Sequence, residues 1–401
     1  MKAGWQVKKL GEVCEVVNGG TPKTGVKEYW GNEHLWITPA EMGKRLSPYA
    51  NDTARKITSQ GLRDSSARLL PPDSVILSSR APIGHLVINT KLMATNQGCK
   101  GLVPSESLAY KYLFYFLQAN VDLLNDLGSG ATFKELSGSK LKEVTIPFPV
   151  RPEQQRIVAI LDQAFERIAK ARANTEQNLQ NARALFESHL QSVFSVRPEL
   201  VEGRGEGWIE KTLGNCCILR SGTTLDPKLE MDSGEIAYLK VADMNLSENI
   251  NGIFCSSRYV NENAVNISNL LPIGTTIFPK RGGSILTNKK RLTKRVIYAD
   301  LNIMGVTPKA ELLPEFLFSY FLSVDMRKLN NGSSIPQINN YTIEPLLISF
   351  PVSLIEQRIV VEKIESLSQE AQRLEALYQR KITLLDELKK SLLQQAFAGE
   401  L

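Results

Sequence analysis

The chain has 401 residues, 42% of them hydrophobic and 22% charged, and its formal net charge at pH 7 is +6. This length exceeds what one hydrophobic core usually organises, so we expect at least two domains of ordinary globular composition. The apolar runs fall short of the roughly 20 residues that cross a membrane, and the polar start predicts no export signal, so we expect a cytoplasmic protein.

Cysteine and histidine usage argues against disulfides and metal sites. Of the five cysteines only Cys216 and Cys217 are close in sequence, and adjacent cysteines fit neither a CxxC redox pair nor a zinc knuckle. We expect reduced, buried thiols. The three histidines are scattered, which leaves little material for a metal centre.

Residues 1–150 mix short β-rich runs with turn residues, which predicts an α+β domain. We expect a strand at 75–77 and an apolar helix at 110–118. Residues 151–197 then show helical periodicity, which predicts a central long-helix region. Its apolar residues are Ile157, Leu161, Phe165 and Ile168 and, beyond a polar stretch, Leu179, Ala182, Phe186 and Val193.

From residue 207 the chain repeats itself. Gly4-Trp5 recurs as Gly207-Trp208, Leu69-Leu70-Pro71 as Leu270-Leu271-Pro272, Phe148-Pro149-Val150 as Phe350-Pro351-Val352, and Gln155-Arg156-Ile157-Val158 as Gln357-Arg358-Ile359-Val360. The offsets all fall between 201 and 204. A colinear series of this kind indicates an internal duplication. It predicts a linker at 198–206 and a second domain at 207–351, with a strand at 276–278 and a helix at 315–323.

Residues 352–401 predict a second long-helix region. Apolar residues recur every three or four positions from Val360 to Ala396, with polar residues between them. A narrow apolar stripe on a long helix needs a partner to cover it. The duplication supplies that partner, because the region 151–197 carries a similar stripe.

Motifs for covalent chemistry are missing. Gly20 and Gly25 have the spacing of a phosphate-binding loop, but Val26-Lys27 follows where Lys and Ser or Thr are required. We find no GxGxxG after a strand, no GxSxG and no HExxH. These negatives favour a binding protein that is not an enzyme by itself.

Basic residues point to nucleic acid. Lys280–Arg295 contains seven basic residues and no acidic one, and its two glycines predict a mobile loop that lies along DNA. A solvated hairpin is the alternative. The candidate DNA-binding residues in this segment are Lys280, Arg281, Asn288, Lys289, Lys290, Arg291 and Lys294.

The first copy has its own candidates, Ser79, Arg80 and Asn96, with further basic residues upstream at Lys44, Arg45, Arg55, Lys56, Arg63 and Arg68. Arg80 and Arg281 occupy matching positions, and arginine is the usual bidentate reader of guanine. Both could equally be framework residues held in ion pairs. The two segments differ although their flanks align, which is what readers of two different half-sites would need.

Several motifs resemble those of a known family. Asn18-Gly19-Gly20-Thr21-Pro22, then Glu28-Tyr29-Trp30-Gly31 and Leu35-Trp36-Ile37-Thr38, resemble the opening of a target-recognition domain in the specificity subunits of type I restriction–modification enzymes. The second copy, Ser221-Gly222-Thr223-Thr224 and then 234–244, is looser and lacks the Tyr-Trp-Gly. The exits at 146–157 and 350–359 also resemble the family, so the resemblance covers essentially the whole chain.

The resemblance implies an α+β fold with two tandem target-recognition domains, each followed by a long helix, the two helices packing as an antiparallel coiled coil. It implies that the chain reads a bipartite, asymmetric target in double-stranded DNA. It also implies two methyltransferase subunits and two restriction–translocase subunits as partners. S-adenosylmethionine, ATP and Mg²⁺ would then be used by those partners, and this chain would bind no cofactor.

Two alternatives stay open. A specificity subunit of the same fold could serve a methylation-only system that has no nuclease. A coiled-coil scaffold with two lectin-like or peptide-binding heads would have no DNA role. Salt-dependent retention on DNA would separate this scaffold from a specificity subunit of either kind of system.

Overall fold

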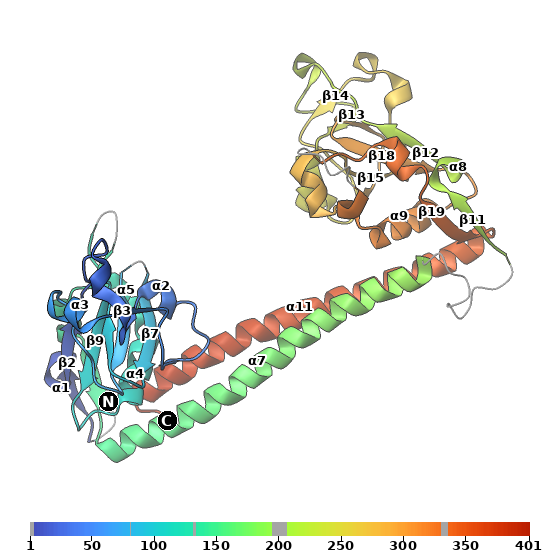
Figure 1. Cartoon of the computed structure of the whole chain (residues 1–401). Helices are drawn as coiled ribbons and strands as arrows, with labels where there is room; N and C mark the ends of the chain where they lie inside the picture. Colours follow the sequence, from blue (N-terminus) through green and yellow to red (C-terminus); the bar gives the residue numbers. More distant parts are fainter. Residues whose placement is uncertain (1–3, 81, 131–133, 195–206, 330–335) are drawn as a thin grey trace. The chain divides into compact units, whose positions relative to one another are not determined.

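A computed structural model describes residues 4–80, 82–130, 134–194, 207–329 and 336–401. The chain forms two compact units: Met1–Glu176 with Arg380–Leu401, and Gln177–Gln379. Each unit holds one globular domain and part of both long helices, α7 (Arg151–Phe194) and α11 (Leu354–Ala398), as Figure 1 shows. The linker predicted at 198–206 and the end of the first helical region, 195–197, lie outside the described residues.

Three sheets build the globular part of the first unit. A five-stranded sheet has the order β2-β9-β6-β7-β4, a three-stranded sheet the order β5-β3-β8, and β1 pairs with β10. The strands are β1 (Gln6–Lys9), β2 (Cys14–Asn18), β3 (Trp30–Ile37), β4 (Tyr49–Ala50), β5 (Arg55–Ile57), β6 (Val75–Ser79), β7 (Ile83–Asn89), β8 (Met93–Thr95), β9 (Cys99–Pro104) and β10 (Thr145–Phe148).

Short helices connect these strands, and α4 (Tyr110–Ala119) packs on the large sheet against β6, β7 and β9. Six consecutive residues of α4, 112–117, are buried because the helix lies between the sheet and the long helices. The others are α1 (Leu10–Val13), α2 (Pro39–Met42), α3 (Ser59–Arg63), α5 (Val121–Leu127), α6 (Gly138–Glu143) and the 3₁₀ turn η1 (Lys27–Tyr29).

The second unit repeats this plan with one strand fewer in the large sheet. The sheets have the orders β12-β18-β15-β16 and β14-β13-β17, and β11 pairs with β19. The strands are β11 (Trp208–Thr212), β12 (Cys217–Ser221), β13 (Ile236–Leu239), β14 (Tyr259–Val260), β15 (Thr276–Pro279), β16 (Arg291–Leu292), β17 (Ile297–Ala299), β18 (Ile303–Pro308) and β19 (Leu347–Pro351).

Helix α9 (Pro314–Ser323) covers β15, β16 and β18, as α4 covers its own sheet. The remaining helices are α8 (Leu213–Cys216) and α10 (Asn340–Ile343). Six 3₁₀ turns lie between β12 and β16: η3 (Pro227–Leu229), η4 (Val241–Asn245), η5 (Ser247–Asn249), η6 (Glu262–Ala264), η7 (Ile267–Asn269) and η8 (Gly282–Thr287); η9 (Met326–Leu329) follows α9. The strands and helices predicted at 75–77, 110–118, 276–278 and 315–323 are therefore confirmed.

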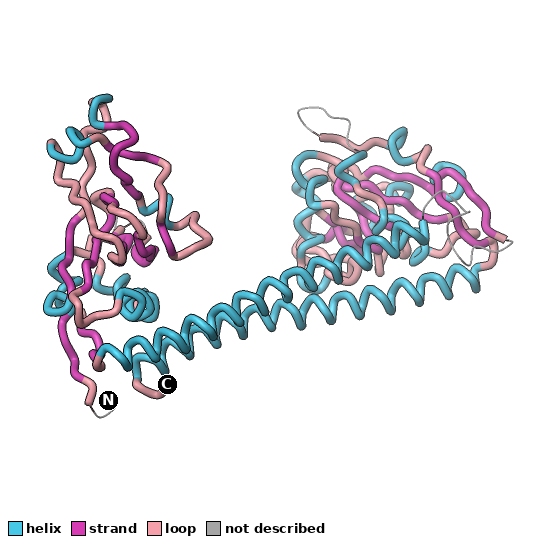
Figure 2. The backbone as a smooth tube through the Cα atoms, turned by 60° about the horizontal axis from the view of Figure 1, so that its bottom comes forward, coloured by secondary structure: helices cyan, strands magenta, loops and turns pink. Residues whose placement is uncertain are grey.

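Segments of α7 and α11 lie side by side and antiparallel within each unit, as the long helices of Figure 2 illustrate. In the first unit Arg172 bonds Asp386, and Phe397 packs edge-on against Tyr112 of α4, with ring centroids 5.1 Å apart. In the second unit Arg183 bonds Glu375 at 3.0 Å, and Phe194 packs edge-on against Phe316 of α9 at 5.4 Å. The expected fold class, with its antiparallel helix pair, is confirmed.

A buried glutamine fixes the start of each long helix to its domain. Gln154 accepts from Ala109 N (2.8 Å) and donates to the carbonyls of Ser107 (3.0 Å) and Pro149 (2.9 Å). Gln357 makes the same three bonds, to Leu313 N, Glu311 O and Pro351 O, at 2.8–2.9 Å. Both side chains are fully buried. An amide suits this site because it satisfies one donor and two acceptors at once.

This match corrects the sequence register. The recurring letters pair Gln155 with Gln357, whereas the structure makes Gln154 the equivalent of Gln357 and leaves Gln155 exposed. The second copy has one more residue between its Phe-Pro-Val segment and the buried glutamine. The domain boundaries at 150, 207 and 351 stay predictions.

Candidate nucleic-acid interface

The ends of the large sheets have the same backbone hydrogen bonds in both units. In the first unit Gly19 N donates to Cys99 O (3.1 Å) and Asn96 N to Ile37 O (2.9 Å). In the second, Gly222 N donates to Ile303 O and Asp300 N to Leu239 O, both at 2.9 Å. Asn96 and Asp300 are therefore equivalent positions.

The side chains at these strand ends form what we call the strand-end clusters. The first consists of Ser79, Arg80, Asn96 and Glu135, and the second of Lys280, Arg281, Asp300 and Gln337. An extra bridge closes each: Arg80 pairs with Glu135, and Arg281 with Gln337, in antiparallel register. The structure thus brings together three of the first-copy candidates, which are 17 positions apart at most.

Close packing holds the first cluster together. A Cβ placed on Gly98 would lie 3.1 Å from Asn96 Oδ1 and 3.4 Å from Arg80 Cγ, so both side chains surround that glycine. Ser79 is fully buried, which leaves its hydroxyl no surface toward DNA. Arg80 is 36% exposed, and its Nη1 lies 3.5 Å from Glu135.

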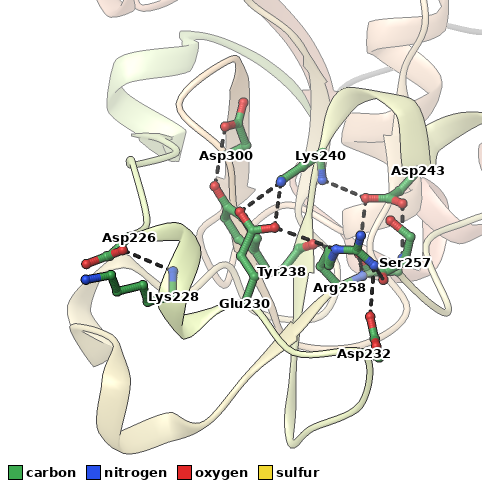
Figure 3. A network of polar contacts seen from close by, with 11 residues as sticks. Asp226, Lys228, Glu230, Asp232, Tyr238, Lys240, Asp243, Ser257, Arg258 and Asp300 are labelled. Carbon is green, nitrogen blue, oxygen red and sulfur yellow. Dashed lines mark hydrogen bonds and ion pairs between the residues drawn. The ribbon is translucent and has the colours of Figure 1, made fainter.

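The Asn96 amide is engaged within the protein. Its Oδ1 accepts from Gly98 N (2.7 Å), and its Nδ2 donates to Thr21 Oγ1 and Gln97 Oε1 (2.9 Å each). Asp300 makes the corresponding turn, accepting from Asn302 N at 2.9 Å, and it accepts from Tyr238 at 3.4 Å, as Figure 3 shows. Both residues thus shape the turn before β9 or β18.

The segment Lys280–Arg295 is not the mobile loop that its composition predicts. It folds as η8, a left-handed residue at Asn288 (φ 53°) and strand β16. Asn288 Oδ1 accepts from Met326 N (2.9 Å) and from Lys290 Nζ (2.8 Å), which fastens the turn to the chain after α9. Asparagine tolerates the left-handed conformation better than most residues, which explains its place here.

Several cations of this segment point into the protein. Lys290 is only 4% exposed, donates to Val324 O at 2.7 Å, and burial lowers its pKa to about 8. Arg291 donates to the carbonyl of Asn249 at 2.8 Å. Lys294 lies 3.9 Å from Glu315, and Lys289 is half-buried. The number of basic residues in this segment therefore overstates the positive charge that is available to DNA.

Lys280 is buried like Lys290, whereas its neighbour Arg281 is not. Lys280 is 7% exposed and donates to Ser221 Oγ at 2.7 Å. Burial, and then the neighbouring charge of Arg281, lower the Lys280 pKa. Arg281 is exposed, and the Gln337 amide lies 3.2 Å from its Nε.

Cations in and around the three-stranded sheets are paired only in part. In the first unit the Arg55 guanidinium lies 3.6 Å from the centroid of the Trp30 ring, Lys56 pairs with Asp52 at 3.0 Å, and Arg45 with Glu41 at 3.1 Å. Lys44, Arg63 and Arg68 are exposed.

In the second unit Glu230 lies between Lys240 (2.7 Å) and Arg258 (3.7 Å), and Asp232 also pairs with Arg258 (Figure 3). Lys240 and Arg258 are thus compensated locally by acidic side chains.

A family model described as the type I restriction modification DNA specificity domain matches residues 2–179 and again residues 205–384. The chain belongs to this family. The two matches confirm the duplication and the resemblance noted in the sequence.

Specificity subunits of this family are similar to the chain over its full length. The MjaIX specificity subunit of Methanocaldococcus jannaschii is 28% identical over 99% of this chain and 93% of its own length. The EcoKI specificity subunit of Escherichia coli is 22% identical over 99% of this chain and 89% of its own. The EcoR124I/EcoR124II subunit of E. coli is 33% identical, but over only 39% of each chain.

Two solved structures have the same fold. A chain from a type I restriction–modification system, solved to explain its assembly and conformational transition, matches with a TM-score of 0.81 at 16% identity and covers 100% of this chain and 99% of its own. The HsdS subunit of Thermoanaerobacter tengcongensis matches with a TM-score of 0.67 at 17% identity, covering 100% and 98%. At these identities the likeness shows the fold alone.

The expectation of buried cysteines is confirmed for four of the five. No cysteine of the described residues is in a disulfide; four are buried and Cys255 is half-buried. Burial raises the pKa of Cys14 and Cys99 to about 12, so both stay protonated thiols at neutral pH. Within the described ranges, every helix is too short or too polar to span a bilayer.

Sequence reasoning missed Glu135 and Gln337, the partners of the two matching arginines. They lie more than fifty positions from those arginines, and neither stands in a basic run. The duplication held the signal, because Glu135 and Gln337 are related by the offset of 202 that also relates Phe148 to Phe350.

Proposed function

We propose that this specificity subunit reads a bipartite, asymmetric target in double-stranded DNA, with one half-site for each globular domain. The observation that carries this proposal is the pair of strand-end clusters. Their backbone hydrogen bonds coincide, while three of their four side chains differ. A shared framework with different contact groups suits two readers of unlike sequence, because base edges are distinguished by donor and acceptor pattern.

The chain acts as a scaffold in this proposal. Two methyltransferase subunits and two restriction–translocase subunits assemble with it in the cytoplasm, and an internal duplication suits the binding of two copies of one partner. Those partners use S-adenosylmethionine, ATP and Mg²⁺, and this chain supplies recognition without covalent chemistry. The relatives named as restriction-enzyme specificity subunits support this assignment.

Binding to duplex DNA tests the recognition step. The full-length chain, assembled with its methyltransferase partner, should retain a subset of sequences from a randomised duplex library. Its affinity should fall steeply as salt rises, because phosphate contacts release counterions. Absence of salt-dependent retention on any duplex would support the scaffold alternative instead.

A methylation-only system is the second candidate function. The two readings differ in the nuclease partner and agree on everything that this chain does by itself. Cells that carry the complete gene cluster should restrict unmodified incoming DNA if a nuclease takes part. Methylated targets without restriction would assign the chain to a methylation-only system.

A further inference from the structure

Arg80 and Arg281 occupy equivalent backbone positions, but their side-chain partners differ in charge. Leu136 N donates to Ser79 O at 2.8 Å, and Ile338 N donates to Lys280 O at 2.9 Å. The bridge residues are therefore equivalent: Glu135 faces Arg80, and Gln337 faces Arg281. One copy places a carboxylate beside its arginine where the other places a neutral amide.

Glu135 neutralises the first cluster. Its carboxylate lies 3.5 Å from Arg80 Nη1 and 3.8 Å from the Nζ of Lys100, which is itself 7% exposed. A carboxylate shared by two cations offsets much of their field and holds the guanidinium in the protein. The half-buried Arg80 thus has the surroundings of a framework residue.

The second cluster also holds a carboxylate, Asp300, but that carboxylate accepts from Asn302 and Tyr238 and not from the arginine. The Gln337 amide lies 3.2 Å from Arg281 Nε and 3.3 Å from Nη2, so it can orient the guanidinium without neutralising it. Among the described residues no ion pair involves Arg281 or Lys280. Arg281 is exposed beside a buried lysine, which raises the local positive potential.

We propose that Arg281 contacts a hydrogen-bond acceptor of DNA, either a guanine base edge or a backbone phosphate, whereas Arg80 is held within the protein by Glu135. Both acceptors match a positioned guanidinium. The inference rests on the proposed DNA-reading function and names which of the two arginines carries it.

Four variants of the full-length chain, assembled with its methyltransferase partner, test the proposal on a randomised duplex library. Arg281→Ala should lower affinity for the enriched sequence about tenfold or more. Gln337→Glu should have a similar effect, because it recreates the setting of Glu135. Arg80→Ala should lower affinity less than about threefold. Glu135→Gln should not lower affinity by more than Arg80→Ala does.

Lys309→Ala is the matched control for charge. Lys309 is an exposed cation of the same unit that follows the far end of β18. Its loss should change affinity less than about threefold. An equal loss in Lys309→Ala and Arg281→Ala would overturn the proposal, since long-range charge would then suffice. A larger loss in Arg80→Ala than in Arg281→Ala would overturn it as well.

The library also separates the two acceptors. Loss of one G·C preference in Arg281→Ala would assign a base edge. An unchanged motif with uniformly weaker binding, and a salt slope reduced by about 0.9, would assign a phosphate. If the unsubstituted chain enriches no sequence at all, the proposed function itself fails, which is distinct from a chain that reads DNA without Arg281.

Discussion

The two strand-end clusters share their backbone and differ in their side chains. Where the first copy has Ser79, Asn96 and Glu135, the second has Lys280, Asp300 and Gln337. The buried glutamines that fix the long helices are identical by contrast, bond for bond. The duplication has kept the contacts that the fold requires and changed three of the four side chains at the strand ends.

Replacing the buried glutamines tests the shared part of this comparison and should have the largest effect. Gln154→Leu or Gln357→Leu leaves one amide and two carbonyls without their partners, which should cost about 3 kcal/mol in either unit. Native-state hydrogen exchange of α4 and α9 measures the loss in each unit separately. Gln155→Leu, at the exposed neighbour, is the control and should stay within about 0.5 kcal/mol.

The two costs should be similar. If Gln154→Leu is costly and Gln357→Leu is neutral, the two helix starts are not equivalent and the corrected register is wrong.

Lys290 tests a difference between the copies. By strand register it stands where the first copy has Leu86. Its pKa is about 8 in the fold, against an ordinary 10.5, so above pH 8 the unfolded chain binds more protons than the folded one. Stability therefore rises with pH, by about 2 kcal/mol between pH 7 and pH 9.5 from this group.

Urea denaturation of the unsubstituted chain and of Lys290→Met at both pH values isolates this contribution. The difference between the two proteins should shift in favour of the lysine form as pH rises. A constant difference would mean that Lys290 is accessible to water, and it would return this residue to the candidates for DNA contact.

The ion pairs between the long helices should have the smallest effect. Arg172 pairs with Asp386 in the first unit and Arg183 with Glu375 in the second, with side chains at least one-third exposed. Arg172→Ala and Arg183→Ala should each cost less than about 1 kcal/mol, and less still in high salt. Thermal unfolding at low and high salt measures this. A larger cost in one unit alone would show that the helix pair is stabilised unevenly.

Much of the fold could be predicted because the internal duplication and the helical spacing of apolar residues are visible in the sequence. The duplication predicts two α+β domains, and the apolar stripes predict two long helices that each need a partner. The sequence repeat pairs Gln357 with Gln155, one position beyond its structural equivalent Gln154, because matching residue types do not guarantee matching hydrogen bonds. An inserted residue before the helix is visible only once Gln154 is seen inside the fold.

The site was less predictable than the fold. A run of basic residues indicates positive charge but does not say which side chains are buried, so Lys290 and Arg291 looked equivalent to Arg281. Asn96 stays a candidate for DNA contact, and its amide also fastens a turn that the sequence alone does not show. Ion-pair partners such as Glu135 come from distant parts of the chain, and only tertiary structure joins them to their arginines.

Mapping methylated adenines by single-molecule sequencing shows whether the two domains read different half-sites. The chain would be expressed with its methyltransferase partner in a host that lacks adenine methylation of its own. Two unlike domains predict one motif made of two different half-sites separated by an unread spacer. A palindromic motif, or a single uninterrupted one, would contradict the claim that the two copies read different DNA.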